Sequence, residues 1–493
     1  MTERARFGPL DVSLALALFS IALALRVSFV AAAPFDGLYG QDAYAYHDFA
    51  LALRTAVSTG SAPGPFFWPL GYPALLAAGY ALFGASAQTA QAISLLLGAL
   101  LAPLVYVLAR QVGPGRAGAV AGALVMAVCG QAIQSSLVVM SDIPALALAT
   151  ASAVVVRGYL QRGGAARLAA AVLLLALAGI TRWIYLALAL PWALAVLAER
   201  RRWPAWREIA AGALAAAVVL VPQMAYSATN PFPALNHPWV TGWTPANAAA
   251  RVFDNPDGHF VYDQVNALFY AHPYYDAYFL SPLLTPLLIL GAWALRKRRA
   301  AWLMLLGWTL IPYVFLAGIP YQNIRFPLIV MPAVAVLAGA GADALLGLAR
   351  GRRFGRVVPA ALAVWIAAGL IQAVFTGRPM VTQFIANQQA DKNAAAWVTD
   401  QIPHGATLYT YGLALTLKHY TDFDVHELYF ETPDSLARER LAIHADYLFA
   451  NIWVIEHQWA GRSPEIAYDW LRDQRGLTPL GHFGNYQLFR IAA

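Results

Sequence analysis

The chain has 493 residues, of which 60% are hydrophobic and only 12% are charged, and its mean hydropathy is +0.54. A soluble domain is usually about one quarter charged, so this chain lacks the polar surface that a water-soluble protein needs. The net charge of +7 comes from short Lys and Arg runs between apolar segments, a pattern of membrane topology that argues against a nucleic-acid partner. The single cysteine, Cys129, excludes an intrachain disulfide and a cysteine-based metal site.

Apolar segments recur from the N-terminus to residue 374, and each is close to the roughly 20 residues that a helix needs to cross a bilayer. We expect about eleven spans, and the first reads as a retained span because it is longer than the apolar region of a signal peptide. The expected spans are residues 10–33, 88–110, 117–136, 143–159, 168–180, 183–198, 209–226, 279–294, 301–317, 327–346 and 357–374.

Charge resolves the ambiguous stretch 168–198, which is too short for two full spans and too long for one upright helix. Arginines cluster before it, at 157–167, and after it, at 200–207, and the positive-inside rule puts both clusters on the cytoplasmic side. The chain must therefore enter and return as a hairpin of two short helices, with its tip at residues 181–183 near the outer interface. The predicted topology is then N-terminus in and C-terminus out.

Three long segments lie outside the bilayer in this topology. Residues 34–87 are expected to contain interfacial helices near 43–57 and 68–83. Residues 227–278, rich in Pro, Asn, His and aromatic residues, are expected to form an ordered loop on the membrane surface. The third segment is the C-terminal tail.

The tail from residue 375 is soluble in character and alternates helical and strand-like patterns, which predicts a small α/β domain. We therefore expect a transmembrane catalytic module over 1–374 and an extracytoplasmic domain over 375–493. The helical patterns lie near 387–400, 434–443 and 464–475, and the strand patterns at 406–411, 447–455 and 486–491.

Ionisable residues at membrane depth are costly and indicate function by default. On the outer side of the predicted topology these residues are Arg26, Asp142, Arg182 and Arg325, and Asp42 adds a carboxylate in the first external loop. Arg26 lies about two turns below the outer end of its helix, which favours snorkelling or an internal pair over ligand contact.

Asp42 lies in a tyrosine-rich segment that could begin a helix, with Tyr46 on the same face and Asp48 pointing away. One interpretation is a general base above the membrane, beside aromatic rings that can pack on a sugar. The other is that Asp42 is merely the N-cap of that helix. Tyr44, Tyr46 and the later Tyr321 are the candidate rings for substrate packing.

Arg182 and Arg325 are candidate ligands for the donor phosphate, because a guanidinium presents a planar fork that matches phosphate oxygens. The alternative for each is snorkelling to lipid head groups. Asp142, in the turn Ser141-Asp142-Ile143-Pro144, could orient an acceptor or bind a divalent cation such as Mg or Mn. It could equally serve only to start the helix that follows.

Taken in order, these motifs resemble the GT-C superfamily of polytopic membrane glycosyltransferases, which includes the protein O-mannosyltransferases and lipid A aminoarabinose transferases. Asp42 corresponds to the family's acidic residue in the first external loop, and residues 69–76 to its interfacial helix. The turn at 141–144 resembles its Ser-acid-x-Pro turn. Thr181-Arg182 resembles its Thr-Arg hairpin, and residues 325–327 the Arg-aromatic start of a late span.

The resemblance implies an inverting glycosyltransferase that moves a monosaccharide from a polyprenyl-phosphate donor to an extracytoplasmic glycan, lipid or protein acceptor. Asp42 would be the general base, while Arg182 and Arg325, with or without a metal at Asp142, would stabilise the charge on the leaving phosphate. It also implies a multi-pass protein of the cytoplasmic (inner) membrane, in contact with membrane lipids, whose active site faces the periplasm or exterior.

Two other classes of function stay open on the sequence alone. A transporter or lipid flippase would favour repeated halves and helices broken at the midplane. A membrane scaffold would use its tail to bind a partner, and its outer-face charges would be no more than helix caps.

Overall fold

The computed structural model describes residues 7–199, 203–229, 237–349, 357–439 and 445–492. The chain forms two compact units, which are described separately. The helical unit comprises Met1–Gly37, Tyr46–Ala249 and Val265–Gln383. The α/β unit comprises Leu38–Ala45, Ala250–Gln264 and Phe384–Ala493.

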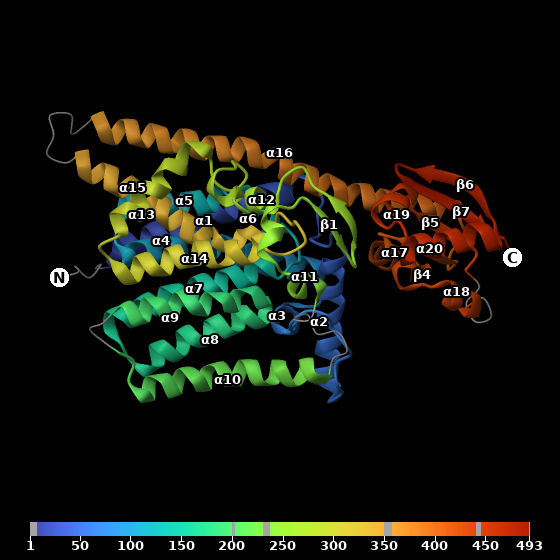
Figure 1. Cartoon of the computed structure of the whole chain (residues 1–493), viewed down its shortest axis with the longest axis horizontal. Helices are drawn as coiled ribbons and strands as arrows, with labels where there is room; N and C mark the ends of the chain where they lie inside the picture. Colours follow the sequence, from blue (N-terminus) through green and yellow to red (C-terminus); the bar gives the residue numbers. More distant parts are fainter. Residues whose placement is uncertain (1–6, 200–202, 230–236, 350–356, 440–444, 493) are drawn as a thin grey trace. The chain divides into compact units, whose positions relative to one another are not determined.

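The helical unit contains the apolar segments that the hydropathy pattern predicts (Figure 1). Its helices up to the second external loop are α1 (Pro9–Ala32), α2 (Gln41–Thr59), α3 (Gly71–Phe83), α4 (Ala87–Val112), α5 (Arg116–Val128), α6 (Gly130–Leu137), α7 (Asp142–Arg162), α8 (Ala165–Thr181), η1 (Trp183–Leu188), α9 (Ala189–Ala198) and α10 (Trp206–Thr229). From the loop onward they are α11 (Pro238–Thr241), η3 (Pro245–Ala249), α12 (Asn266–Tyr270), η4 (His272–Tyr274), η5 (Pro282–Leu284), α13 (Thr285–Leu295), α14 (Arg299–Ala317), η6 (Phe326–Val330), α15 (Met331–Ala349) and α16 (Val357–Gln401).

Seven helices of the described chain are long and apolar enough to cross a membrane, and α5 with α6 makes an eighth that is bent by 52°. Three shorter apolar helices, Ala165–Thr181, Trp183–Ala198 and Pro282–Leu295, correspond to the remaining expected spans. The fourth short apolar helix, Gly71–Phe83, is the interfacial helix expected at 68–83. The predicted polytopic helical bundle is confirmed.

Several arginine side chains lie at one end of this bundle and form polar contacts there. Asp11, near the start of α1, is buried and pairs with Arg110 at 3.2 Å and with Arg116 at 2.8 Å. Arg298, which precedes α14, donates to the Val112 carbonyl at 2.8 Å. We call this the basic end. Arg110, Arg116 and Arg298 lie in the short basic runs between apolar segments, and the positive-inside rule assigns such runs to the cytoplasm.

The long helices pack side by side around buried apolar side chains. α8 lies between α7 and α10, α15 lies against α5 and α13, and α4 contacts α1, α5 and α7 (Figure 1). Close approach depends on small residues, as at Gly122, where an added Cβ would lie 2.5 Å from the Ala335 carbonyl oxygen. Packing of this kind is typical of membrane helices, whose association cannot rely on the hydrophobic effect.

The α/β unit is built on a five-stranded sheet of order β4-β3-β5-β7-β6. β3 is parallel to both β4 and β5, whereas β7 is antiparallel to β5 and β6. A separate two-stranded hairpin is formed by β1 and β2. The strands are β1 (Val252–Asn255), β2 (Gly258–Val261), β3 (Thr407–Tyr411), β4 (Asp424–Glu427), β5 (Tyr447–Ala450), β6 (Leu477–Phe483) and β7 (Tyr486–Ile491).

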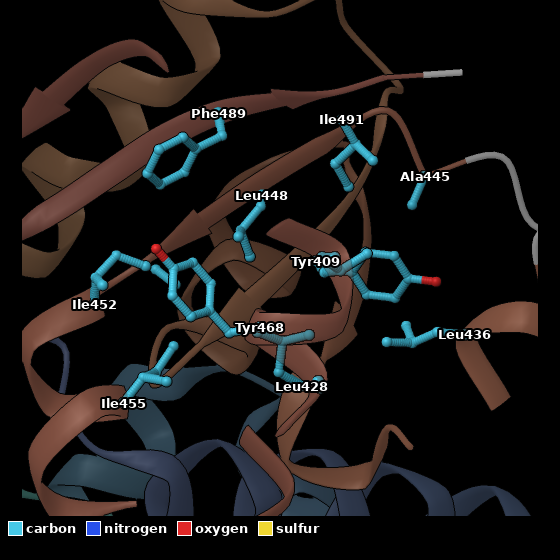
Figure 2. Close-up of a cluster of buried hydrophobic side chains, with 13 residues drawn as sticks. Tyr409, Leu428, Leu436, Ala445, Leu448, Ile452, Ile455, Tyr468, Phe489 and Ile491 are labelled. Carbon is cyan, nitrogen blue, oxygen red and sulfur yellow. The ribbon is translucent and has the colours of Figure 1, made fainter. Parts of the chain in front are cut away.

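Alternate residues of the central strands fill two cores, one on each face of the sheet. On one face, Leu448 and Phe489 pack against Ile455 and Tyr468 from the covering helices (Figure 2). The other face packs against the end of α16 and against α17. The helices and turns of this unit are α17 (Ala414–Tyr420), η7 (Leu428–Phe430), α18 (Pro433–Glu439), α19 (Ile452–Gln458), α20 (Ser463–Trp470) and η8 (Leu471–Arg475).

Three features of the tail differ from the expectation. α16 is continuous over Val357–Gln401, so the expected boundary at 374/375 falls inside a helix and the α/β unit resumes at Phe384. The strand pattern at 447–455 divides into β5 and α19, and residues 440–444 of the expected helix 434–443 lie outside the described residues. The edge strands β4 and β6 lack the apolar alternation that would reveal them.

Candidate active site

Arg182 stands at the tip of a helical hairpin, as the charge pattern predicts. α8 ends at Thr181, Arg182 is extended with φ −157°, and η1 begins at Trp183. Gly71 of α3 packs directly on this tip, because a Cβ there would lie 2.7 Å from the Ile180 carbonyl oxygen. The tip is therefore held by backbone contact and by the chain reversal itself.

Asp142 brings Arg182 and Arg325 together. It is the first residue of α7 and is only 3% exposed. Its Oδ1 lies 3.1 Å from Nη1 of Arg182, and its Oδ2 lies 3.8 Å from Nη1 of Arg325. The arginine side chains are 21% and 20% exposed, whereas the carboxylate between them is buried. We call these three residues the arginine cluster.

Neighbouring side chains fix the orientation of Arg182. Its Nη1 also donates to Ser141 Oγ at 3.3 Å, and Ser141 Oγ accepts a second hydrogen bond from the Tyr46 hydroxyl at 3.0 Å. The guanidinium lies 5.1 Å from the centre of the Phe326 ring, a cation–π distance. Ser141 and Phe326 are adjacent in sequence to the predicted residues, but the motifs alone do not assign them these contacts.

Arg325 and Asp142 are held in a similar way. Asn323 Oδ1 accepts from both the backbone N–H and Nε of Arg325, at 3.0 and 3.3 Å. The Tyr185 hydroxyl donates to the Asp142 carbonyl at 3.3 Å. Tyr185, buried in the arm that follows the hairpin tip, has no sequence signal that links it to Asp142.

The arginine cluster carries two positive charges and one negative charge, which favours an anion. Mg²⁺ and Mn²⁺ prefer several carboxylate or carbonyl oxygens in one site, whereas the Asp142 carboxylate faces two guanidinium groups. Within the described residues there is also no group of three His, Cys, Asp or Glu side chains that could hold a metal ion. The residues therefore do not fit a divalent cation at Asp142, and the carboxylate instead positions the two arginines.

The predicted aromatic residues lie in different surroundings. Tyr321 stacks on Trp239, with ring centroids 4.2 Å apart and an interplanar angle of 9°. Tyr46 is 1% exposed and packs against Tyr72. Tyr44 is 2% exposed and belongs to the α/β unit. The rings of Tyr44 and Tyr46 are covered by protein, which favours a supporting role for both over direct packing on a sugar.

Asp42 lies in the first turn of α2, the helix expected near 43–57. The helix begins at Gln41, so Asp42 is inside the helix and not at its cap. Its side chain is half-buried, whereas Asp48 is exposed as expected. His47 is buried and hydrogen-bonded to the Tyr80 hydroxyl at 2.6 Å, a structural contact. Asp42 belongs to the α/β unit and the arginine cluster to the helical unit.

Arg26 forms internal hydrogen bonds and does not snorkel. The side chain is fully buried and donates through Nε to Ser136 Oγ at 3.0 Å and through Nη1 to the Ala22 carbonyl at 2.9 Å. It therefore joins α1 to α6 within the bundle, which favours the internal alternative over snorkelling.

Residues 72–233 match the family model described as dolichyl-phosphate-mannose-protein mannosyltransferase. The segment includes Asp142 and Arg182. The chain is a glycosyltransferase with the GT-C fold. No curated protein sequence matches it.

Solved structures show that the fold extends over nearly the whole chain. ArnT from Cupriavidus metallidurans, bound to undecaprenyl phosphate, aligns with a TM-score of 0.60 and 15% identity over 98% of this chain and 97% of that chain. The Archaeoglobus fulgidus oligosaccharyltransferase tethered to an acceptor peptide aligns with a TM-score of 0.58 and 12% identity over 96% and 74%. The same enzyme complexed with Zn and sulfate gives 0.59 and 12% over 97% and 73%. At these identities the likeness establishes the fold.

Proposed function

We propose that this GT-C glycosyltransferase takes a monosaccharide from a polyprenyl-phosphate donor and transfers it to an acceptor hydroxyl outside the cytoplasm. The observation that carries the proposal is the convergence of two arginine side chains, each partly exposed, on one buried carboxylate. The ArnT structure with undecaprenyl phosphate supports a lipid phosphate as the donor's leaving group. The acceptor class, whether glycan, lipid or protein, is set by surfaces beyond this cluster.

The arginine cluster suits a phosphate that gains charge as its bond to sugar breaks. A guanidinium binds phosphate oxygens through two parallel N–H groups and stays charged at any working pH. Asp142 holds the two arginines together and oriented before the donor arrives, so little reorganisation is needed when charge develops. One net positive charge remains to stabilise the anionic leaving group.

Asp42 is proposed as the general base. The acceptor O–H proton moves to the Asp42 carboxylate while the acceptor oxygen forms a bond to the anomeric carbon. The bond from that carbon to the phosphate oxygen breaks, and the lipid phosphate leaves as an anion that needs no protonation. A single displacement of this kind inverts the anomeric configuration, so an NMR analysis that finds retention would refute the mechanism.

The predicted orientation places the arginine cluster on the non-cytoplasmic side. Asp142 begins α7, and the other end of α7 reaches the basic end of the bundle, where Arg157 and Gln161 donate to the Gln111 carbonyl at 3.4 and 3.2 Å. The 21 residues of α7 span about 30 Å, the thickness of the hydrocarbon core. If the basic end is cytoplasmic, the arginine cluster lies at the periplasmic or exterior face of the inner membrane.

The transporter alternative shares one feature with the structure, the bent α5–α6 pair. The break falls at Cys129, where Cys129 and Arg26 are fully buried and Arg26 donates through Nη1 to the Ala127 carbonyl at 3.4 Å. The family match over residues 72–233 favours glycosyl transfer.

Binding of a polyprenyl monophosphate to the purified protein tests the phosphate assignment. We expect Arg182→Gln and Arg325→Gln each to weaken binding by tenfold or more, the loss of one charge-assisted contact of about 1.5–3 kcal/mol. Arg296→Gln is the matched control, because Arg296 stacks on Trp293 next to the basic residues before α14. Equal loss in all three variants, or none in any, would contradict the assignment.

A further inference from the structure

The start of α2 is held by the α/β unit to which it belongs. Gln388, in the part of α16 that belongs to the α/β unit, donates through Nε2 to the Leu38 carbonyl at 2.7 Å. Within the first turn, the Thr416 hydroxyl of α17 donates to the Tyr44 hydroxyl at 3.5 Å. The segment that carries Asp42 is therefore bound before and after the carboxylate by the C-terminal domain.

A third contact involves Glu427, the last residue of β4. It is in register with Thr410 of the parallel strand β3, so its side chain lies where the carboxyl ends of the two strands meet. Gly412, which follows β3, donates its N–H to Glu427 Oε1 at 3.2 Å. The Ala414 N–H and the Gln41 side chain lie close enough to this carboxylate to lower its pKa as hydrogen-bond donors. Gln41 directly precedes Asp42.

The surroundings of the Glu427 carboxylate shift its pKa toward neutral pH. Burial raises its pKa from 4.5 to about 7, although the backbone N–H groups, Lys418 and Gln41 act in the opposite direction. Burial raises the pKa values of Tyr411 on β3 and Tyr486 on β7, and the nearby Glu427 charge raises them further. The groups that face Glu427 thus come from α2, α17, β3 and β7.

We infer that Glu427 is a positioning residue for the base: it holds the first turn of α2 through Gln41 and so sets where the Asp42 carboxylate stands. The inference rests on the proposed role of Asp42. Ionised Glu427 accepts charge-assisted hydrogen bonds, which are about twice as strong as neutral ones. Protonation weakens the hold on Gln41, and a base displaced by about 1 Å can lose about 10²-fold in rate.

The test measures sugar transfer against pH for wild type, Glu427→Gln and Gln41→Ala in the full-length protein. We expect the wild-type kcat to rise with pH through about 7 as Glu427 ionises. Both variants lose that step and have a kcat roughly tenfold lower at pH 8, while KM for the donor stays the same because the arginine cluster is untouched. The matched control is Glu465→Gln, which removes another carboxylate that accepts a backbone N–H, from Gly461 at 2.5 Å.

A double-mutant cycle separates positioning from general destabilisation. Because Glu427 acts through Gln41, the double variant should be no slower than the slower single variant. Additive losses, or a pH step that persists in Glu427→Gln, would overturn the inference. Gln41→Ala provides the same readout if Glu427→Gln fails to fold. Full activity of Asp42→Asn would instead reject the proposed base, whereas an inactive Asp42→Asn with an unchanged Glu427→Gln profile rejects only the role of Glu427.

Discussion

Gly71 offers a way to move the tip of the hairpin without touching a charged residue. A Cβ at this position would lie 2.7 Å from the Ile180 carbonyl oxygen and 2.8 Å from both the Ile180 carbonyl carbon and Thr181 Oγ1. Two of these atoms are backbone, so no side chain can turn away to relieve the contact. In Gly71→Ala, α3 or the hairpin tip must shift, and Arg182 follows Thr181 directly.

The size of the effect follows from these distances. Ordinary contact begins at 3.4 Å, so the shortest distance must increase by about 0.7 Å. Overpacking of this kind costs about 1–3 kcal/mol in folding free energy. A shift approaching 1 Å at a group that stabilises the transition state lowers the rate by up to about 10²-fold. We therefore expect Gly71→Ala to reduce kcat/KM by roughly tenfold to a hundredfold and to lower the unfolding midpoint.

The assay compares Gly71→Ala with Gly79→Ala on the same helix. At Gly79 the added Cβ meets only the Cδ1 end of the Ile93 side chain, which can rotate away. Transfer kinetics and the thermal unfolding midpoint in detergent are measured for both variants. If Gly71→Ala is as active as Gly79→Ala, the placement of Arg182 by this close contact is refuted.

Three further predictions concern charges. Arg182→Lys and Arg325→Lys keep the charge but lose the planar fork, and each should raise the donor KM about tenfold in transfer kinetics; an unchanged KM would favour head-group snorkelling. Asp11→Asn removes the buried partner of two arginines at the basic end. We expect the free energy of unfolding to fall by about 1–3 kcal/mol, a range that is discounted because the two arginines are partly exposed. The kcat per folded molecule should not change. Because the pKa of Glu427 is raised to about 7, the folded protein loses stability as pH rises from about 4 to 7. Thermal midpoints at pH 5 and pH 8 should therefore differ less in Glu427→Gln than in wild type, and an equal difference would contradict the shift.

Sequence reasoning predicted the helical unit well because bilayer thickness imposes a length on each apolar run. The hairpin at residues 181–183 followed from charge alone. The continuity of α16 could not be predicted, because a helix that leaves the membrane keeps no hydropathy signal, and its last turns are helical by packing on the sheet. β4 was missed for a related reason: a four-residue edge strand with the sequence Asp-Val-His-Glu has too few apolar residues to show a period.

In the candidate site, too, some residues could be recognised from the sequence and others only from the structure. Asp142, Arg182 and Arg325 stand out in sequence because charge beside apolar spans is rare. The metal assignment for Asp142 could not be tested until the structure placed guanidinium groups on its carboxylate. Glu427 has no motif, and its relation to Gln41, nearly 400 residues earlier in the chain, depends entirely on the fold of the α/β unit.

The measurement that tests the central proposal most directly is sugar transfer from a panel of radiolabelled polyprenyl-phosphate monosaccharides to membrane acceptors, with wild type and Asp42→Asn compared at equal folded amounts. We predict that wild type transfers label from at least one donor and that Asp42→Asn transfers none. Equal transfer by both proteins would remove Asp42 from the mechanism, and no transfer from any donor would contradict a lipid-phosphate-dependent glycosyltransferase.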